Sequence, residues 1–190
     1  MKLKLKFKFL SFLVSLLVFS CGVISDKKAS KKIDEDYFKL TSEFIKSING
    51  NENFILDEKP FEYEYFDCVE QLISDSITFN DSERKYIESE IQKNKLQKWS
   101  NELVKNAKII SNDTIKKIFS ERSKGWNYFK KNIGEDFSTY SAPIFLRDNK
   151  YCLFYFSKSC GSLCGRGMLM FYKFENGKWK SVKSYCTWIS

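Results

Sequence analysis

Histidine is absent from this chain of 190 residues. Its absence excludes zinc and haem sites with histidine ligands, Ser-His-Asp triads and general bases built on imidazole. The sequence also lacks the concentrated basic face that a nucleic-acid-binding surface needs, because its lysines are spread along the chain. No set of side chains typical of a catalytic site stands out. We therefore expect no catalytic residues, no metal, no cofactor and no nucleic-acid partner.

An apolar run long enough to cross a membrane is also missing, since a spanning helix needs about 20 apolar residues. The longest run, FLSFLVSLLVF, has the length of the hydrophobic region of a signal peptide and follows the basic segment MKLKLKFK. Residues 1–20 are therefore predicted to be a signal peptide. Its removal takes away four lysines, so the net charge falls from +8 to +4.

Cys21 stands at the end of this apolar run, between Ser20 and Gly22. A small residue followed by cysteine at this place resembles the lipobox of bacterial lipoproteins, in which the cysteine carries lipid and becomes the mature N-terminus. The alternative is ordinary secretory cleavage nearby, with Cys21 an incidental thiol. We favour lipid attachment at Cys21, which predicts a protein anchored in the bacterial cell envelope, on the periplasmic face of the outer membrane.

The mature chain divides by composition into a tether and one domain. Residues 21–35 are small and polar, which is typical of a flexible tether. Residues 36–190 are long enough for a single domain with an ordinary core. Residues 36–135 carry mostly helical patterns, and residues 140–190 carry mostly strand patterns. This order predicts an α+β fold with N-terminal helices packed on a C-terminal antiparallel meander of about four strands.

Turn signals set the order of the predicted strands. Asn176-Gly177 suits a type I′ turn, which needs positive φ at both central residues. Asp148-Asn149 is a weaker turn signal. Pro143 cannot donate a hydrogen bond to a strand ladder, so the first strand should lie at an edge. The predicted strands are Tyr140–Leu146, Lys150–Phe156, Met168–Glu175 and Lys178–Trp188.

Alternation along these strands places apolar side chains on both faces of the sheet, so we expect both faces to be covered. Among the helices, Asn80 and Glu83 have the spacing of a capping box. The triplet Ser111-Asn112-Asp113 is predicted to cap a short helix over Thr114–Ser120.

Six cysteines in a secreted chain indicate disulfides. With a two-residue turn at Asn176-Gly177, Cys186 would lie opposite Gly167, level with the predicted loop. We therefore expect a bridge from Cys186 to Cys160 or Cys164, and the competing pair is Cys160–Cys164. Cys152 is expected either to pair with Cys68 or to remain a buried thiol.

The predicted loop Ser157–Gly167 is the candidate ligand-binding segment of the chain. Its glycines expose backbone N–H groups, and Arg166 could meet an anion. A second reading is a redox-active dithiol, and a third, which we favour, is a hairpin loop closed by a disulfide. The candidate residues are Cys160, Gly161, Cys164, Gly165, Arg166 and Gly167.

The part of the chain from Thr114 onward contains Gly125-Trp126, Asn176-Gly177-Lys178-Trp179 and Trp188-Ile189-Ser190, with the glycines Gly161, Gly165 and Gly167 between them. In these segments the chain resembles a family of uncharacterised bacterial envelope lipoproteins. That resemblance implies the same helix-then-sheet arrangement and transfers no catalytic residue.

These observations favour a lipid-anchored envelope protein that binds or scaffolds and does not catalyse. Its expected partners are the membrane, through the lipid, and an envelope protein or small ligand. Two alternatives remain open at this point: a thiol-active enzyme that uses Cys160 or Cys164, and an inhibitor or immunity-type protein.

Overall fold

The computed structural model describes residues 20–63, 68–93 and 95–190. The side chains of residues 20–34 and of Cys68 lie outside that description, as do the predicted signal peptide and the lipid site. The chain divides into two compact units, residues 1–41 and 42–190. The helices are α2 (Ser20–Asn49), α3 (Cys68–Ser74), α4 (Asp81–Lys93), α5 (Asn112–Ser120) and α6 (Gly125–Asn132). The strands are β1 (Phe54–Asp57), β2 (Ala107–Ile110), β3 (Phe137–Tyr140), β4 (Ile144–Leu146), β5 (Tyr151–Gly161), β6 (Cys164–Glu175) and β7 (Lys178–Ile189).

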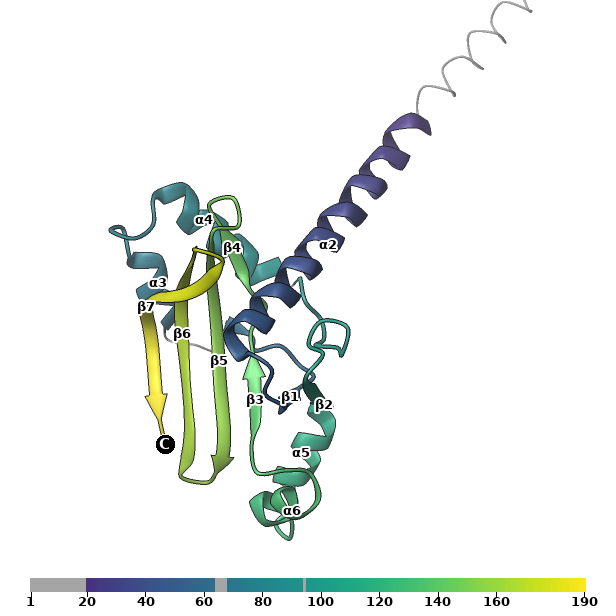
Figure 1. The fold of residues 1–190 in the computed structure, drawn as a ribbon, viewed down its shortest axis with the longest axis vertical. Coiled ribbons are helices and arrows are strands. Elements are labelled where there is room, and N and C mark those ends of the chain that lie inside the picture. The colour runs from purple at the N-terminus through teal and green to yellow at the C-terminus, as the bar shows by residue number, and fades with distance from the viewer. Residues whose placement is uncertain (1–19, 64–67, 94) are drawn as a thin grey trace, which may run out of the picture. The chain divides into compact units, whose positions relative to one another are not determined.

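The second unit is built on a mixed sheet with the strand order β2-β1-β3-β5-β6-β7, and β4 pairs with β5 beside β3. β1 is parallel to β2 and β3, whereas the remaining pairs are antiparallel. The predicted α+β class is therefore confirmed. Figure 1 shows β5, β6 and β7 as long neighbouring strands that form the antiparallel part of the sheet.

The predicted first strand, Tyr140–Leu146, spans the last residue of β3, a break and the whole of β4, and β3 and β4 pair with different parts of β5. Pro143 falls in the break, where no ladder hydrogen bond is needed. β4, which lies wholly within the predicted strand, pairs with β5 alone among the described strands, as expected for an edge, whereas β3 is paired on both sides, by β1 and β5. β1 and β2 were not predicted, because neither segment shows the alternation typical of a strand. They pair in parallel and add two strands to the expected sheet.

The turn at Asn176-Gly177 forms as predicted, with φ of 51° and 75°. The register beyond it differs from the prediction, because two irregularities interrupt the β6–β7 ladder. Cys186 consequently lies opposite Leu169, and Trp188 lies opposite Gly167. Each extra residue reverses the faces that follow it. Val182, which simple alternation places on a covered face, is exposed, whereas Tyr185 is buried.

One face of the sheet packs against α3 and α4. Leu72 and Ile87 from these helices lie in one buried cluster with Leu153, Leu169 and other side chains of the central strands. Asn80 caps α4 as predicted: its Oδ1 accepts from Glu83 N at 2.9 Å, and Asn80 N donates to Glu83 Oε2 at 3.1 Å. The capping box therefore fixes where α4 begins against the sheet.

Phe44, near the end of α2, is fully buried against the opposite face. Its ring meets four aromatic rings at centroid distances of 5.1–6.0 Å, all in edge-on geometry. Such pairs add to the free energy gained by burying the aromatic area itself. The rings around Phe44 belong to Phe145, Phe154, Tyr172 and Trp179.

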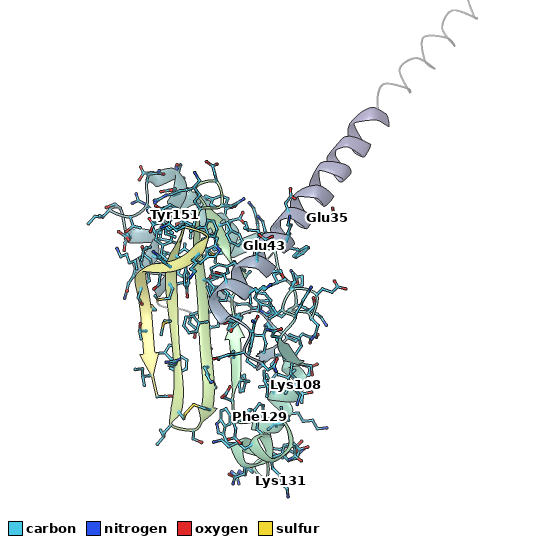
Figure 2. All side chains as sticks on the ribbon, viewed as in Figure 1. Glu35, Glu43, Lys108, Phe129, Lys131 and Tyr151 are labelled. Atoms are coloured by element: carbon cyan, nitrogen blue, oxygen red, sulfur yellow. A yellow bond between two sulfur atoms is a disulfide. The ribbon has the colours of Figure 1, made fainter. Side chains whose placement is uncertain are left out.

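A third cluster lies at the β1–β2 end of the sheet, where α5 and α6 pack. Ile115, Ile118 and Phe129 are its buried helical members. Phe129 lies within this cluster, whereas Lys131 is exposed (Figure 2). Ser111 caps α5 as predicted, since its Oγ accepts from Thr114 N at 3.2 Å.

Charged side chains connect α4 and the residue that follows α3 to the strand region of the sheet. Arg147 donates to both carboxylate oxygens of Glu83, at 2.6 and 3.1 Å, although its backbone has a φ of 53°. Asp75 accepts from Lys183 Nζ at 2.6 Å and from Tyr185 OH at 2.7 Å. Desolvation by burial raises the pKa of Asp75, but the hydrogen bonds outweigh it and hold this pKa well below its usual range.

We predict that Asp75→Asn weakens the acid sensitivity of the fold. The ionised carboxylate stabilises the native state above its unfolded-state pKa of about 4, and this contribution is lost as the pH falls toward the lower folded-state pKa. Between about pH 7 and about pH 3, wild type should therefore lose more unfolding free energy than the variant in urea titrations. Glu52→Gln removes an exposed carboxylate and should follow wild type. Equal losses in wild type and Asp75→Asn would contradict the prediction.

Candidate functional site

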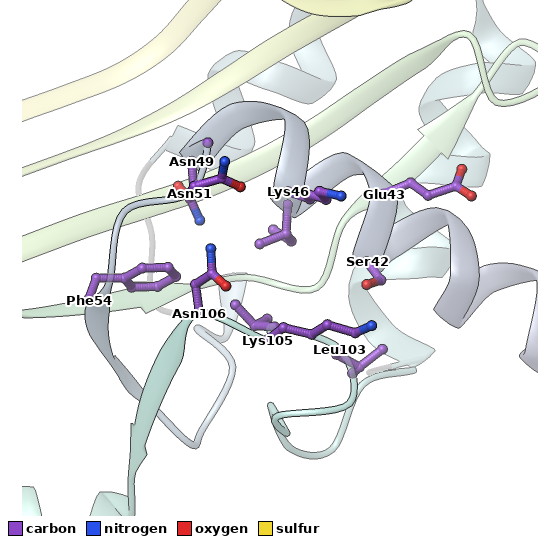
Figure 3. A pocket seen from close by; sticks show the side chains of 12 residues that line it. Ser42, Glu43, Lys46, Asn49, Asn51, Phe54, Leu103, Lys105 and Asn106 are labelled. Carbon is purple, nitrogen blue, oxygen red and sulfur yellow. The ribbon is translucent and has the colours of Figure 1, made fainter.

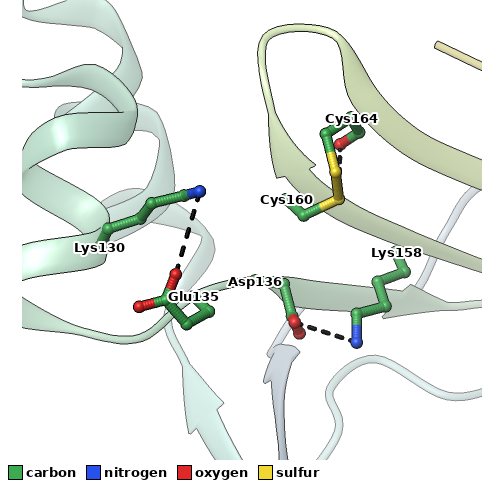
Figure 4. Close-up of a disulfide and its surroundings, with 6 residues drawn as sticks. All are labelled: Lys130, Glu135, Asp136, Lys158, Cys160 and Cys164. Carbon is green, nitrogen blue, oxygen red and sulfur yellow. Dashed lines mark hydrogen bonds and ion pairs between the residues drawn. A yellow bond between two sulfur atoms is a disulfide. The ribbon is translucent and has the colours of Figure 1, made fainter.

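The segment predicted as a Gly/Cys loop is the end of the β5–β6 hairpin. The two strands run on to Gly161 and Cys164, which pair across the turn. Cys160 and Cys164 form a disulfide with a Cα–Cα distance of 5.1 Å (Figure 4). The favoured reading of a hairpin closed by a disulfide is therefore what the structure shows, with less loop and more strand than expected.

The glycines of this hairpin make room for the side chain of Trp188. A Cβ added to Gly167 would lie 2.3 Å from Trp188 Nε1, and one added to Gly165 would lie 3.1 Å from the same indole ring. The indole N–H donates to Tyr155 OH at 3.0 Å. These two glycines are thus required by the packing of Trp188 on the sheet, a role that their positions in the sequence do not reveal.

Backbone groups of the hairpin also form hydrogen bonds with the end of the chain after β7. Gly165 N donates to Ser190 O at 3.2 Å, and Ser190 N donates back to Gly165 O at 3.0 Å. The N–H group of Gly165 is therefore not available to an anion. Arg166 is exposed and lies opposite Lys158, which pairs with Asp136 at 2.9 Å (Figure 4).

The cysteines depart from the expected pairing. Cys186 does not pair with Cys160 or Cys164, because the irregular β6–β7 register moves it to a position opposite Leu169. Cys186 is itself in a disulfide whose partner lies outside the described side chains. Cys152 is a free, fully buried thiol, as one of the two alternatives predicted, and desolvation raises the pKa of its thiol well above the usual value.

A cavity of about 370 Å³ lies between the end of α2, the start of β1 and the segment that precedes β2. Figure 3 shows the asparagines that line it gathered at the Phe54 end, with the lysines toward Ser42 and Glu43. Its walls combine apolar and polar side chains. The lining residues are Ser42, Glu43, Ile45, Lys46, Asn49, Gly50, Asn51, Phe54, Leu103, Val104, Lys105 and Asn106.

Asn49 lies in this cavity with half of its amide unpaired. Its Oδ1 accepts from Tyr140 OH at 3.0 Å, and burial raises the pKa of Tyr140 to about 12, so that this hydroxyl stays a donor. Its Nδ2 is buried and has no hydrogen-bond partner among the described residues. A buried amide N–H without an acceptor costs free energy, so an acceptor at this point would stabilise the site.

Sequence reasoning missed this cavity. Asn49-Gly50 indicates only the end of a helix. The spacing of Leu96, Trp99, Leu103 and Val104 predicts a helix, although the structure shows none over residues 95–106. The cavity forms because the end of α2 lies beside residues 103–106, more than fifty residues further along the chain. No local sequence pattern predicts a contact between segments so far apart.

The described part of the chain contains no group of three or more Cys, Asp or Glu side chains that could hold a metal ion. None of its helices is both long and apolar enough to cross a membrane.

We predict that Gly167→Ala destabilises the fold by about 1–3 kcal/mol, because the added methyl group overlaps the indole of Trp188 and the hydroxyl of Tyr155. Chemical denaturation measures the loss. Gly161→Ala is the matched control, since its Cβ would meet only Cys164 Cβ, at 3.3 Å. Trp188→Leu should lessen the cost of Gly167→Ala in the double variant, and full additivity would show that the indole is not the obstacle.

Thiol labelling should separate the cysteines. After mild reduction, we expect Cys160 and Cys164 to alkylate in the folded protein, whereas Cys152 reacts only after unfolding because it is fully buried. Peptide mapping by mass spectrometry measures both. The double variant Cys160→Ser/Cys164→Ser should keep the fold and lose at most about 2 kcal/mol, since the bridge closes a very short loop. Alkylation of Cys152 in the native state would contradict its placement.

Comparisons of the chain with protein-family models, with curated proteins and with solved structures find no match. The resemblance to envelope lipoproteins accordingly stays a prediction, and the function has to be argued from the residues themselves.

Proposed function

We propose that this chain is a lipid-anchored protein of the bacterial cell envelope that binds a ligand or partner without turning it over. Support for the anchor comes from the sequence, where a basic segment, an apolar run of signal-peptide length and Cys21 follow in the order typical of lipoproteins. The lipid places the domain at the membrane surface, and a dissolved or membrane-bound partner then meets it there.

The observation that carries the binding function is the cavity beside the end of α2. It is concave, it is lined by amides, amines and apolar side chains, and it holds a buried N–H group that lacks an acceptor. Glu43 is the one carboxylate on its wall, and no second acid or thiol stands beside it. Hydrolysis and group transfer need a paired acid and base or an activated nucleophile, so this lining is suited to binding.

Intact mass of the chain purified from bacterial envelopes tests the anchor. We expect a product that begins at Cys21 and carries a diacyl or triacyl mass, and we expect Cys21→Ser to accumulate unprocessed. Cys152→Ser, which changes a buried free thiol, is the matched control and should be processed normally. A mature chain with an unmodified Cys21 would overturn the proposed anchor.

A further inference from the structure

Neither lysine of the cavity, Lys46 or Lys105, forms an ion pair with a carboxylate among the described side chains, so no acidic partner there neutralises its amine. Lys46 stands in the last turn of α2, where a cation also complements the helix dipole. That explanation does not extend to Lys105, which follows Val104 in an irregular segment.

These lysines give the cavity a positive balance, since Glu43 is the sole acid among the lining residues. An exposed amine in water gains little from a single distant charge, but two amines on one cavity wall raise the local concentration of anions. A carboxylate can accept hydrogen bonds from both at once, and such charge-assisted bonds are stronger than neutral ones. Glu43 lies at this same end of the cavity, but the two lysines outnumber it, so the Ser42 side is suited to an organic anion.

The other end of the cavity offers neutral amides. Asn49, Asn51 and Asn106 can each donate and accept, and the unpaired Nδ2 of Asn49 requires an acceptor. The ring of Phe54 and the side chain of Ile45 add apolar wall beside them. Amides next to an aromatic ring match a molecule with hydroxyl or acetamido groups around an apolar ring face. The volume of about 370 Å³ lies at the small end of ligand pockets and suits one sugar-sized molecule.

We propose that this cavity binds a sugar acid, with the carboxylate between Lys46 and Lys105 and the hydroxyl or acetamido groups against the three asparagines. The proposal deepens the binding function and rests on it, but it is independent of the lipid anchor. The two ends of the cavity would then recognise different parts of the ligand: the lysines bind the carboxylate, and the asparagines bind the polar substituents of the ring.

Two matched ligand pairs test the charge requirement by isothermal titration calorimetry on the purified full chain. N-acetylmuramic acid and N-acetylglucosamine share an acetamido sugar and differ by a lactyl carboxylate, and glucuronate and glucose differ by a carboxylate alone. We expect at least one acid of the two pairs to bind at least about tenfold more tightly than its neutral partner, the loss expected for one charge-assisted contact. Equal binding of acid and neutral sugar, or no binding of any of the four, would overturn the proposal.

Variants locate the site. Lys105→Met should weaken binding of the acid at least about tenfold and leave the neutral sugar unchanged. Asn106→Leu should weaken both, because it removes contacts to the shared groups. Lys116→Met, an exposed lysine on α5 away from the cavity, is the control and should bind as wild type does. Thermal unfolding of each variant shows that it remains folded, and acid binding that survives Lys105→Met and Asn106→Leu in folded protein would refute the placement.

The result also separates this proposal from the broader function. If no sugar binds but the chain captures an envelope protein without turnover, the sugar-acid site is wrong and the binding function stands. If the acid binds and is chemically consumed, the site stands and the non-catalytic function is wrong.

Discussion

Strand β5 is the constraint on which the rest of the second unit depends. Four consecutive residues, Cys152 to Tyr155, are buried, and in a strand they point alternately to opposite faces. Such a strand needs cover on both sides, because apolar side chains left in water on either face would forfeit much of the free energy of folding. α3 and α4 supply one cover, and the end of α2 supplies the other through Phe44. The placement of these helices thus follows from the need to bury the apolar side chains on both faces of β5.

The last strand of the sheet, β7, and the β5–β6 hairpin beside it show how this end of the sheet is packed. β7 ends the antiparallel side. Two irregularities interrupt its pairing with β6, and the strand carries Lys178, Lys180 and Lys183; bulges and lysines on a terminal strand disfavour pairing with another chain. The irregularities also move Trp188 opposite Gly167, where the indole fills the space that the glycine leaves. A glycine-rich hairpin that resembles a ligand loop in sequence is in fact closely packed. Its disulfide closes the tip of a hairpin that is already paired in strand.

The cavity lies where the cover formed by α2 ends. Asn49 is the last residue of the helix; its Oδ1 accepts a hydrogen bond from Tyr140 on β3, and its Nδ2 has no partner among the described residues. The contact with Tyr140 thus uses only the oxygen of the Asn49 amide. In contrast, the hydrogen-bond network of Asp75, Lys183 and Tyr185 satisfies its own members and acts to hold helix and strand together. The Asp75 network is satisfied by described side chains, whereas the buried Nδ2 of Asn49 is not, and this difference is one ground on which we propose the cavity as a binding site.

Features that arise within a few residues could be predicted before the fold was known. Asn176-Gly177 specifies its turn, Asn80 and Glu83 specify the start of α4, and alternation along β5 specifies a sheet covered on both faces. The tertiary structure decided everything that joins distant segments. The parallel pairing of β1 with β2, the shifted register that sets the neighbours of Cys186, and the cavity at Asn49 all depend on contacts across long stretches of chain. The local preferences of residues do not predict such contacts. The free energy of a long-range contact comes from packing between segments that only the folded chain brings together.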